Sequence, residues 1–378
     1  MTRPLRLVVL SEIPEDASLR RQWNALVLRV DQPQVFYTYE WSLAVQRAYG
    51  VVLHPLLFLG YDESESLCGI AALAQEQEGD GRASFLCGTT GDYCDFLATP
   101  EHKARFVRAV LAELRKRGLD AVTLTNLPAD SNTMTALGQA AEESGYHSFA
   151  RTAYICAQVS LSKLERRPGE TKPVLPGKKM VRRSLAAMGK ESPVRLDHAR
   201  SWDAISPLVT PFADAHVARF EATGRTSNLA QPQRRLFLAE LAKLLSERGW
   251  VVLTRMMSGE RTLAWNYGFQ FDGAWFWYQP TFDNGLEKFS PGFCLLAKIV
   301  EEAAEDPSLR MVDLGLGAEE YKERFANQSR ETMYVTLRAS MAQHVHEILR
   351  YRAAAMIKTS PTIEAGVRKV VARLRGQV

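Results

Sequence analysis

The sequence lacks any long uninterrupted hydrophobic run. Charged residues break every apolar stretch well before the roughly 20 residues that a helix needs to cross a bilayer. The first apolar run, Leu7 to Leu10, is also too short for the core of a secretory signal peptide. We therefore expect a cytoplasmic protein without a transmembrane segment.

The sequence also lacks the residue groupings that usually bind metals. Its five cysteines are scattered and include no C-x-x-C pair of the kind that binds zinc or performs redox chemistry, which fits a reducing compartment. His344 and His346 are the closest histidines, but side chains two positions apart point to different faces of a helix. We predict no metal site and no metal cofactor.

Positive charge is modest overall but unevenly distributed. The net charge is +4, yet the segment 338–378 carries eight Lys and Arg residues against two Glu. A second basic stretch, 163–195, contains Lys178, Lys179, Arg182 and Arg183 among several prolines and glycines. Neither stretch interleaves aromatic residues with its cations, as single-strand nucleic-acid platforms do, so no nucleic-acid partner is expected on this ground.

The length and periodicity indicate a two-domain α/β protein with mixed sheets. A chain of 378 residues with 46% hydrophobic composition exceeds what one core normally covers. Each half shows several short strands followed by a helix, a strand, a second helix and a last strand. We place an N-terminal domain at 1–160, a basic, proline-containing linker at 161–195, a C-terminal domain at 196–340 and a basic helical tail at 341–378.

The tail contains an apolar stripe at helical spacing. The stripe consists of Ile363, Val367, Val370, Val371 and Leu374, and cations lie between or beside these positions. Such a helix either docks on the second domain or lies on an anionic membrane surface. Docking is favoured, because the stripe has no Trp or Phe and its small Val side chains bury little area.

The junction between Tyr278 and Phe293 carries the main functional signal. Turns at Ser258-Gly259 and Asp272-Gly273 indicate an antiparallel meander, and the strand after the next helix must then run parallel to the last meander strand. Neighbouring strands of this kind open a crevice, and the helix that starts there presents unpaired N–H groups and a positive dipole end. We expect this helix start to bind an anionic phosphate.

Three residues suit that position. Ser290 can cap the helix, Pro291 fits its first turn without needing a donor, and Gly292 permits a close approach to the backbone. An ordinary capped helix would have the same sequence, so S-P-G alone does not decide between the two interpretations.

Several segments resemble a known family when they are taken as a set. They are FYTYEWSLAVQRAYG from Phe36, GTTGDYCDFLA from Gly88, KKMVRRSL from Lys178, WFWYQPTFDNGLEKFSPGFCLLAKIVEEA from Trp275 and VDLGLGAEEYKERF from Val312. The order of elements resembles the GNAT acyltransferase fold, and two such halves in tandem resemble the FemAB and CelD (BcsL)-like branch of that superfamily. The resemblance implies two tandem GNAT-like domains, the first of them non-catalytic, followed by the helical tail.

The same resemblance implies an acyltransferase. Acetyl-CoA or another acyl-CoA would donate an acyl group to an amine or hydroxyl acceptor, with the cofactor at Ser290, Pro291, Gly292, Phe293 and Lys322. The CelD likeness suggests an acceptor such as an envelope polysaccharide or a lipid-linked sugar precursor, met by a cytoplasmic enzyme that is peripheral to the inner membrane face. The Q/R-x-x-G-x-G/A signature of simpler GNAT enzymes is absent, which leaves Gly292 alone at the turn.

Proton transfer requires a base for the nucleophile and an acid for the leaving group. Asp283 is the first candidate base, although an aspartate in TFDNG equally suits a turn. Tyr278 and Tyr321 are candidate acids, and Lys322 either steadies an anion or lies on a solvated helix face. Asp92, together with Asp95, could line a groove between the halves.

Three other interpretations compete. The donor could be aminoacyl-tRNA, as in FemAB-type peptidyl transferases, or the chain could be a non-catalytic binding protein of polysaccharide synthesis. The segment VDLGLGAEE also resembles the cofactor loop of methyltransferases. That loop should open a doubly wound domain, and too little chain follows Gly317 to form one.

Overall fold

The computed structural model describes residues 5–76, 81–166, 168, 173–317 and 319–359 of the chain. In the first half it contains strands and helices that alternate in short groups. These are β1 (Arg6–Leu10), α1 (Ala17–Val27), α2 (Tyr39–Tyr49), β2 (Leu53–Tyr61), β3 (Leu67–Glu76), β4 (Arg82–Phe85), β5 (Leu97–Ala98), α3 (Pro100–Lys116), β6 (Ala121–Pro128), α4 (Asn132–Glu143) and β7 (His147–Ser160).

The second half begins with helices and continues into a meander. Its elements are α5 (Lys178–Met188), β8 (Val194–Ala199), α6 (Trp202–Ala222), α7 (Pro232–Ser246), β9 (Val251–Ser258), β10 (Arg261–Phe271), β11 (Ala274–Phe282), a 3₁₀ helix η4 (Asn284–Phe289), α8 (Pro291–Glu305), β12 (Met311–Asp313), α9 (Glu320–Glu323), β13 (Gln328–Arg338) and α10 (Met341–Thr359).

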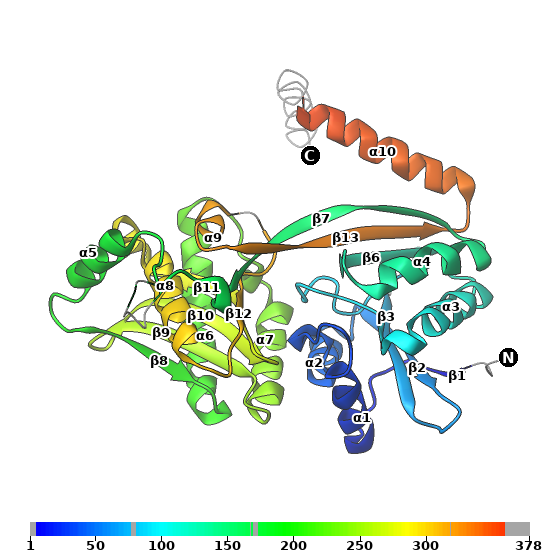
Figure 1. Ribbon diagram of the computed structural model, residues 1–378, viewed down its shortest axis with the longest axis horizontal. Coiled ribbons are helices and arrows are strands. Elements are labelled where there is room, and N and C mark those ends of the chain that lie inside the picture. The colour runs from blue at the N-terminus through cyan, green and yellow to red at the C-terminus, as the bar shows by residue number, and fades with distance from the viewer. Residues whose placement is uncertain (1–4, 77–80, 167, 169–172, 318, 360–378) are drawn as a thin grey trace.

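All of these strands belong to one continuous mixed sheet. Its order is β1-β2-β3-β4-β6-β13-β7-β12-β11-β10-β9-β8, and β5 pairs with β3 outside this path. Figure 1 shows the two halves of the sheet joined by the long ribbon of β7 and β13, with helices packed around each half. The predicted α/β class with mixed strand directions is confirmed.

The connecting ribbon differs from the sequence-based expectation. From the sequence we expect the strand before the linker to begin only at Ile155, but β7 begins at His147, because it pairs with β13 from His147, opposite Arg338, through to Gln158. β13 was expected among second-half strands, yet it lies between β6 and β7 and pairs with both in an antiparallel manner. The sheet therefore continues across residue 160. The domain boundary that we place at this residue stays a prediction.

The expected linker is partly structured. Within it, Lys178–Met188 form helix α5, and the segment Val194–Ala199 forms strand β8 on the edge of β9, which we did not expect from the sequence. The meander strand β11 also runs on to Phe282 rather than ending at Tyr278, because it remains paired with β10 along that length.

Two hydrophobic clusters hold these elements together. The larger cluster extends from the first half into the second, where the fully buried Trp41 of α2 contacts Phe237 of α7 and Phe269 of β10 with ring centroids 5.6 and 5.2 Å apart. The smaller cluster surrounds α8, whose Leu295 and Ile299 are completely buried. Aromatic pairs of this kind add about 0.5 to 1.5 kcal/mol each beyond the area they bury, so the halves are firmly packed on one another.

The last described helix, α10, projects from the end of β13 (Figure 1). It is tied to the sheet by an ion pair of 2.9 Å between Arg338 and Glu347 and by a ring contact between Phe149 and Tyr351. The predicted apolar stripe from Ile363 to Leu374 lies outside the described residues. Among the residues that the structure describes, no helix has the length and apolar character needed to span a membrane.

Candidate functional site

The strands β11 and β12 run parallel and then separate, as the sequence predicted. Their pairing covers Ala274–Phe276 with Met311–Asp313. Beyond that point β11 stays on β10, whereas the N–H of Leu314 donates to the carbonyl of Ala157 in β7 at 3.0 Å. Within the described chain, no strand therefore pairs with the outer edge of β11 from Trp277 onward, although Arg219 of α6 donates to the carbonyl of Pro280 at 3.3 Å.

The start of α8 lies at the end of this strand. Ser290 occupies the N-cap position, as predicted, and Pro291 stands in the first turn. The prediction that the Ser290 side chain caps the helix is wrong: the residue has a φ of 50° and makes no capping hydrogen bond with its side chain. The first N–H groups of a helix, here those of Gly292 and Phe293, have no partner within the helix, so they are available to an anion.

Basic residues lie close to this helix start. The guanidinium of Arg324 stacks over the ring of Phe293 at 4.6 Å from its centroid. A Cβ on Gly177, the N-cap of α5, would lie 3.3 Å from the Phe293 ring, so the first turn of α5 with Lys178 begins beside α8. The start of α5 therefore lies close to the predicted phosphate site, whereas the side chains of Lys178, Lys179, Arg182 and Arg183 are exposed, as on a solvated helix.

Gly292 is closely surrounded on one side. A Cβ there would lie 3.2 Å from Cδ1 of Phe282, the last residue of β11. A larger side chain must therefore push against this ring. That Gly292 lets a ligand approach the backbone closely stays a prediction.

The two candidate acids are both half-buried, and their hydroxyl groups are engaged in hydrogen bonds. The hydroxyl of Tyr278 donates to the carbonyl of Thr90 at 2.5 Å and accepts from Arg234 at 2.6 Å, and burial raises the pKa of Tyr278 far above its usual value. The hydroxyl of Tyr321 accepts from Nε1 of Trp277 at 3.1 Å, and burial raises the pKa of Tyr321 to about 12. Both hydroxyls therefore keep their protons at neutral pH, and their roles as catalytic acids stay predictions.

Lys322 is not on a solvated face. Its side chain is only 6% exposed, and Nζ donates to the carbonyl of Leu316 at 2.7 Å while it pairs with Glu319 at 2.8 Å. A buried ammonium group in this position holds positive charge beside the segment that follows β12.

Asp283 is engaged in holding its own turn. One carboxylate oxygen accepts from Nη2 of Arg261 at 2.7 Å, and the other accepts from the N–H of Gly285 at 2.8 Å. This is the turn geometry that we weighed as the alternative. Its function as a base stays a prediction.

A different carboxylate lies between the separating strands. Asp92 comes from the loop after β4, and its Oδ2 lies 2.5 Å from where a Cβ of Gly315 would be. The same Cβ position is 3.7 Å from the carbonyl oxygen of Trp277 in β11. Gly315 has a φ of 69°, so a residue without a side chain is required there for both space and conformation.

The surroundings of Asp92 favour its protonated form. Burial, followed by the nearby carboxylate of Asp313, raises the pKa of Asp92 to about 7, while Lys322 and Arg234 act in the opposite direction. From the sequence we expect Asp92 only to line a groove between the halves. Its motif, DYCDF, gave no signal that it would meet the segment after β12.

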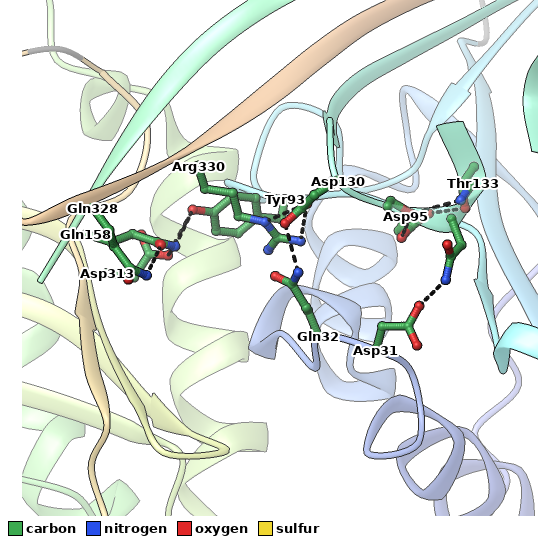
Figure 2. Close-up of polar contacts among 12 residues, drawn as sticks. Asp31, Gln32, Tyr93, Asp95, Asp130, Thr133, Gln158, Asp313, Gln328 and Arg330 are labelled. Atoms are coloured by element: carbon green, nitrogen blue, oxygen red, sulfur yellow. Dashed lines mark hydrogen bonds and ion pairs between the residues drawn. The ribbon is translucent and has the colours of Figure 1, made fainter. Parts of the chain in front are cut away.

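A buried polar network fixes the loop that carries Asp92. Tyr93 donates to Oδ2 of Asp313 at 2.8 Å, and Gln158 donates to the same oxygen at 2.8 Å (Figure 2). The other oxygen of Asp313 accepts from the N–H of Gly315 at 2.8 Å. Asp313 thus holds Tyr93, which follows Asp92 in the sequence, and Gly315, which lies against the Asp92 carboxylate.

Asp95 belongs to a separate group of contacts in the first half. It accepts hydrogen bonds from Ser131, at 2.6 Å, and from Thr133 (Figure 2). Its carboxylate also lies 3.7 Å from the buried Nζ of Lys103. We therefore assign Asp95 to the packing of α3 and α4, since its partners come from these two helices and their caps.

Comparisons with known proteins agree with this arrangement. Residues 177–323 match the family model of an acetyltransferase (GNAT) domain. The match begins at the first turn of α5 and ends in α9, so the matched region includes the start of α8, the separating strands and Lys322. No curated protein matches the sequence.

Solved structures share the fold over nearly the whole chain. FemX is 10% identical with a TM-score of 0.57, covering 87% of this chain and 98% of that one. L-PGS from Bacillus licheniformis is 12% identical with a TM-score of 0.56, covering 91% and 98%. The C-terminal domain of a putative lysylphosphatidylglycerol synthetase from Agrobacterium fabrum is 11% identical with a TM-score of 0.55, covering 88% and 95%. At these identities the likeness concerns the fold alone.

Proposed function

We propose that this protein is an acyltransferase that moves an acyl group from acetyl-CoA or another acyl-CoA to an amine or hydroxyl acceptor. The observation that carries the proposal is the start of α8 within a GNAT domain, at the point where β11 and β12 separate. A helix N-terminus with free N–H groups is suited to a pyrophosphate, and GNAT domains typically use acyl-CoA.

Each part of the donor has a suitable neighbour in this proposal. The pyrophosphate binds the backbone at Ser290 to Phe293, and Arg324 with Lys178 provides positive charge beside it. The pantetheine arm lies along the outer edge of β11, where its amides can bond backbone groups that no neighbouring strand pairs with. Lys322 and Tyr321 then face the acyl end, and the buried ammonium group stabilises the negative charge that develops on the acyl oxygen.

For the acceptor we propose an envelope polysaccharide or a lipid-linked sugar precursor, with the enzyme at the inner membrane face. The CelD-like segments of the sequence support this choice. The basic tail gives a physical reason for attraction to an anionic surface, since each cation adds about 1 kcal/mol of attraction there.

A second donor is aminoacyl-tRNA, as the FemAB-like resemblance implies. The fold shared with FemX and the two lysylphosphatidylglycerol synthetases favours it, and so does the single glycine at the α8 turn. Mass spectrometry of the ligand that purifies with the protein separates the two, because CoA and tRNA differ in mass by far more than any ambiguity of the method.

Calorimetric titration with acetyl-CoA tests the proposed donor site. Reversing charge beside the pyrophosphate with Arg324→Glu should weaken binding by roughly tenfold or more, since a phosphate contact with a cation is worth about 1.5 kcal/mol or more. The matched control is Arg352→Glu on α10, which is also exposed and lies on a different element. Equal affinity in the wild type and the folded Arg324→Glu variant would remove α8 and Arg324 from the donor site.

A further inference from the structure

We propose that Asp92 is the proton acceptor for the attacking nucleophile, so that the first half supplies a catalytic residue to the acyl-transfer site of the second half. This inference rests on the proposed acyltransferase function. It differs from the sequence-based assignment of the base to Asp283 and from the expectation that the first half is non-catalytic.

Position is the first argument. The carboxylate of Asp92 lies against Gly315 and near the carbonyl of Trp277, that is, between the two strands whose separation admits the acyl end of the donor. Asp92 also keeps part of its surface exposed, unlike its neighbours Tyr93 and Cys94, so an acceptor can reach it. Asp283 has both oxygens occupied by Arg261 and Gly285, whereas the Asp92 carboxyl accepts a hydrogen bond from the backbone of Leu316.

The fixation of the carboxylate is the second argument. The loop before Asp92 is held from the second half, because Arg234 donates to Tyr278 and Tyr278 donates to the carbonyl of Thr90. On its other side, Tyr93 is held by Asp313 (Figure 2). These contacts leave little freedom for Asp92, and a catalytic base must be held in this manner to meet its proton at hydrogen-bond distance.

The electrostatic surroundings are the third argument. The ionisable groups that face Asp92 are Asp313, Lys322, Arg234, Tyr278, Cys94 and Cys156. Burial and Asp313 together raise the pKa of Asp92 to about 7. A base with a pKa near the working pH accepts protons more readily than an ordinary carboxylate, and about half of the Asp92 side chains are ionised at pH 7.

The reaction balances without another reagent. As the acceptor nitrogen or oxygen forms a bond to the acyl carbon, its proton passes to a carboxylate oxygen of Asp92. The carbon–sulfur bond of the thioester breaks, and the electron pair leaves with the CoA thiolate. The thiolate then takes up one proton, so that Asp92, once it has released its proton to solvent, returns to its starting form.

The test is the pH dependence of thiol release from acetyl-CoA with glucosamine, an amine-bearing saccharide, as the acceptor. For the wild type we expect the rate to rise with pH through about 7, the pKa of Asp92. Asp92→Asn should lower the rate by roughly a hundredfold or more and abolish this rise, while acetyl-CoA affinity by calorimetry stays unchanged. Asp283→Asn should retain the rise.

A second variant keeps the test informative if Asp92→Asn fails to fold. Lys322→Met removes a cation that lowers the pKa of Asp92, so the residual activity should rise at a higher pH than in the wild type. If the pH midpoint of thiol release in Lys322→Met equals that of the wild type, the proposal is overturned. Full activity of Asp92→Asn also overturns it, and so does an Asp283→Asn variant whose rate no longer rises with pH.

The proposal of acyl-CoA as the donor and the proposal of Asp92 as the base can be rejected separately. If the wild type releases no thiol, the same variants are compared with aminoacyl-tRNA and glucosamine. If the rate with aminoacyl-tRNA falls in the Asp92→Asn variant, Asp92 remains the base and acyl-CoA is rejected as the donor. A wild type that is inactive with both donors overturns both proposals.

Discussion

Replacing Asp92 by Asn should stabilise the protein strongly at alkaline pH and only weakly at acidic pH. The folded protein holds the pKa of Asp92 at about 7, whereas the unfolded chain has a value near 3.8. A carboxyl group whose folded pKa is raised has no effect on stability below the unfolded pKa, where both states are protonated. As pH rises from about 4 to about 7, the unfolded state releases the proton first and stability is lost.

The magnitude follows from the shift. A difference of about 3 pKa units corresponds to a cost of about 4 kcal/mol once the group is ionised in both states, above pH 7. At pH 5 the cost is only about 1.6 kcal/mol, because the folded group is still protonated. The free energy of unfolding of Asp92→Asn relative to the wild type should therefore be higher at pH 8 than at pH 5 by about 2 to 3 kcal/mol.

Urea unfolding followed by tryptophan fluorescence at pH 5 and pH 8 measures this difference. Other titrating groups are present in both proteins, so their contributions cancel in the comparison. Glu323→Gln, which removes an exposed carboxylate on α9, serves as the control and should show no such pH dependence. A constant stability difference between wild type and Asp92→Asn across this range would show that Asp92 ionises with an ordinary pKa, and the electrostatic argument would be refuted.

Two further predictions concern other buried groups. Lys322→Met should reduce turnover by roughly a hundredfold, as expected for loss of one group that stabilises an oxyanion, and unchanged thiol release would limit Lys322 to holding the carbonyl of Leu316. His216 should stay neutral until pH falls to about 4, because burial, followed by Arg219, lowers its pKa to that value. Since the unfolded histidine binds its proton near pH 6.5, stability should fall as pH drops from 6.5 toward 4, and an NMR titration midpoint near 6.5 for the His216 ring would contradict the assignment.

Local signals in the sequence predicted much of the second half. The turns at Gly259 and Gly273 have the positive φ values that glycine permits, and they set the antiparallel meander that was expected. A helix followed by a short strand then requires a parallel neighbour, and β12 is parallel to β11. The start of α8 could be placed for the same reason, since Pro291 fits a first helical turn.

Contacts between distant segments could not be predicted in this way. The alternation that marks an exposed strand is weak in His147 to Tyr154, and nothing in Gln328–Arg338 indicates that its partners lie in the first half. The meeting of Asp92 with Gly315 depends on that same long-range pairing. A carboxylate that belongs to one half by sequence therefore joins a site in the other half only after the whole sheet has formed.

The insertion of β13 between β6 and β7 has a consequence for synthesis on the ribosome. Both neighbours emerge long before β13 does, so each exposes an unpaired backbone edge while the rest of the chain is being translated. Open strand edges are templates for aggregation, and pairings between distant segments form slowly. The nascent first half cannot complete its native sheet independently, and we expect its folding to wait until β13 has been synthesised.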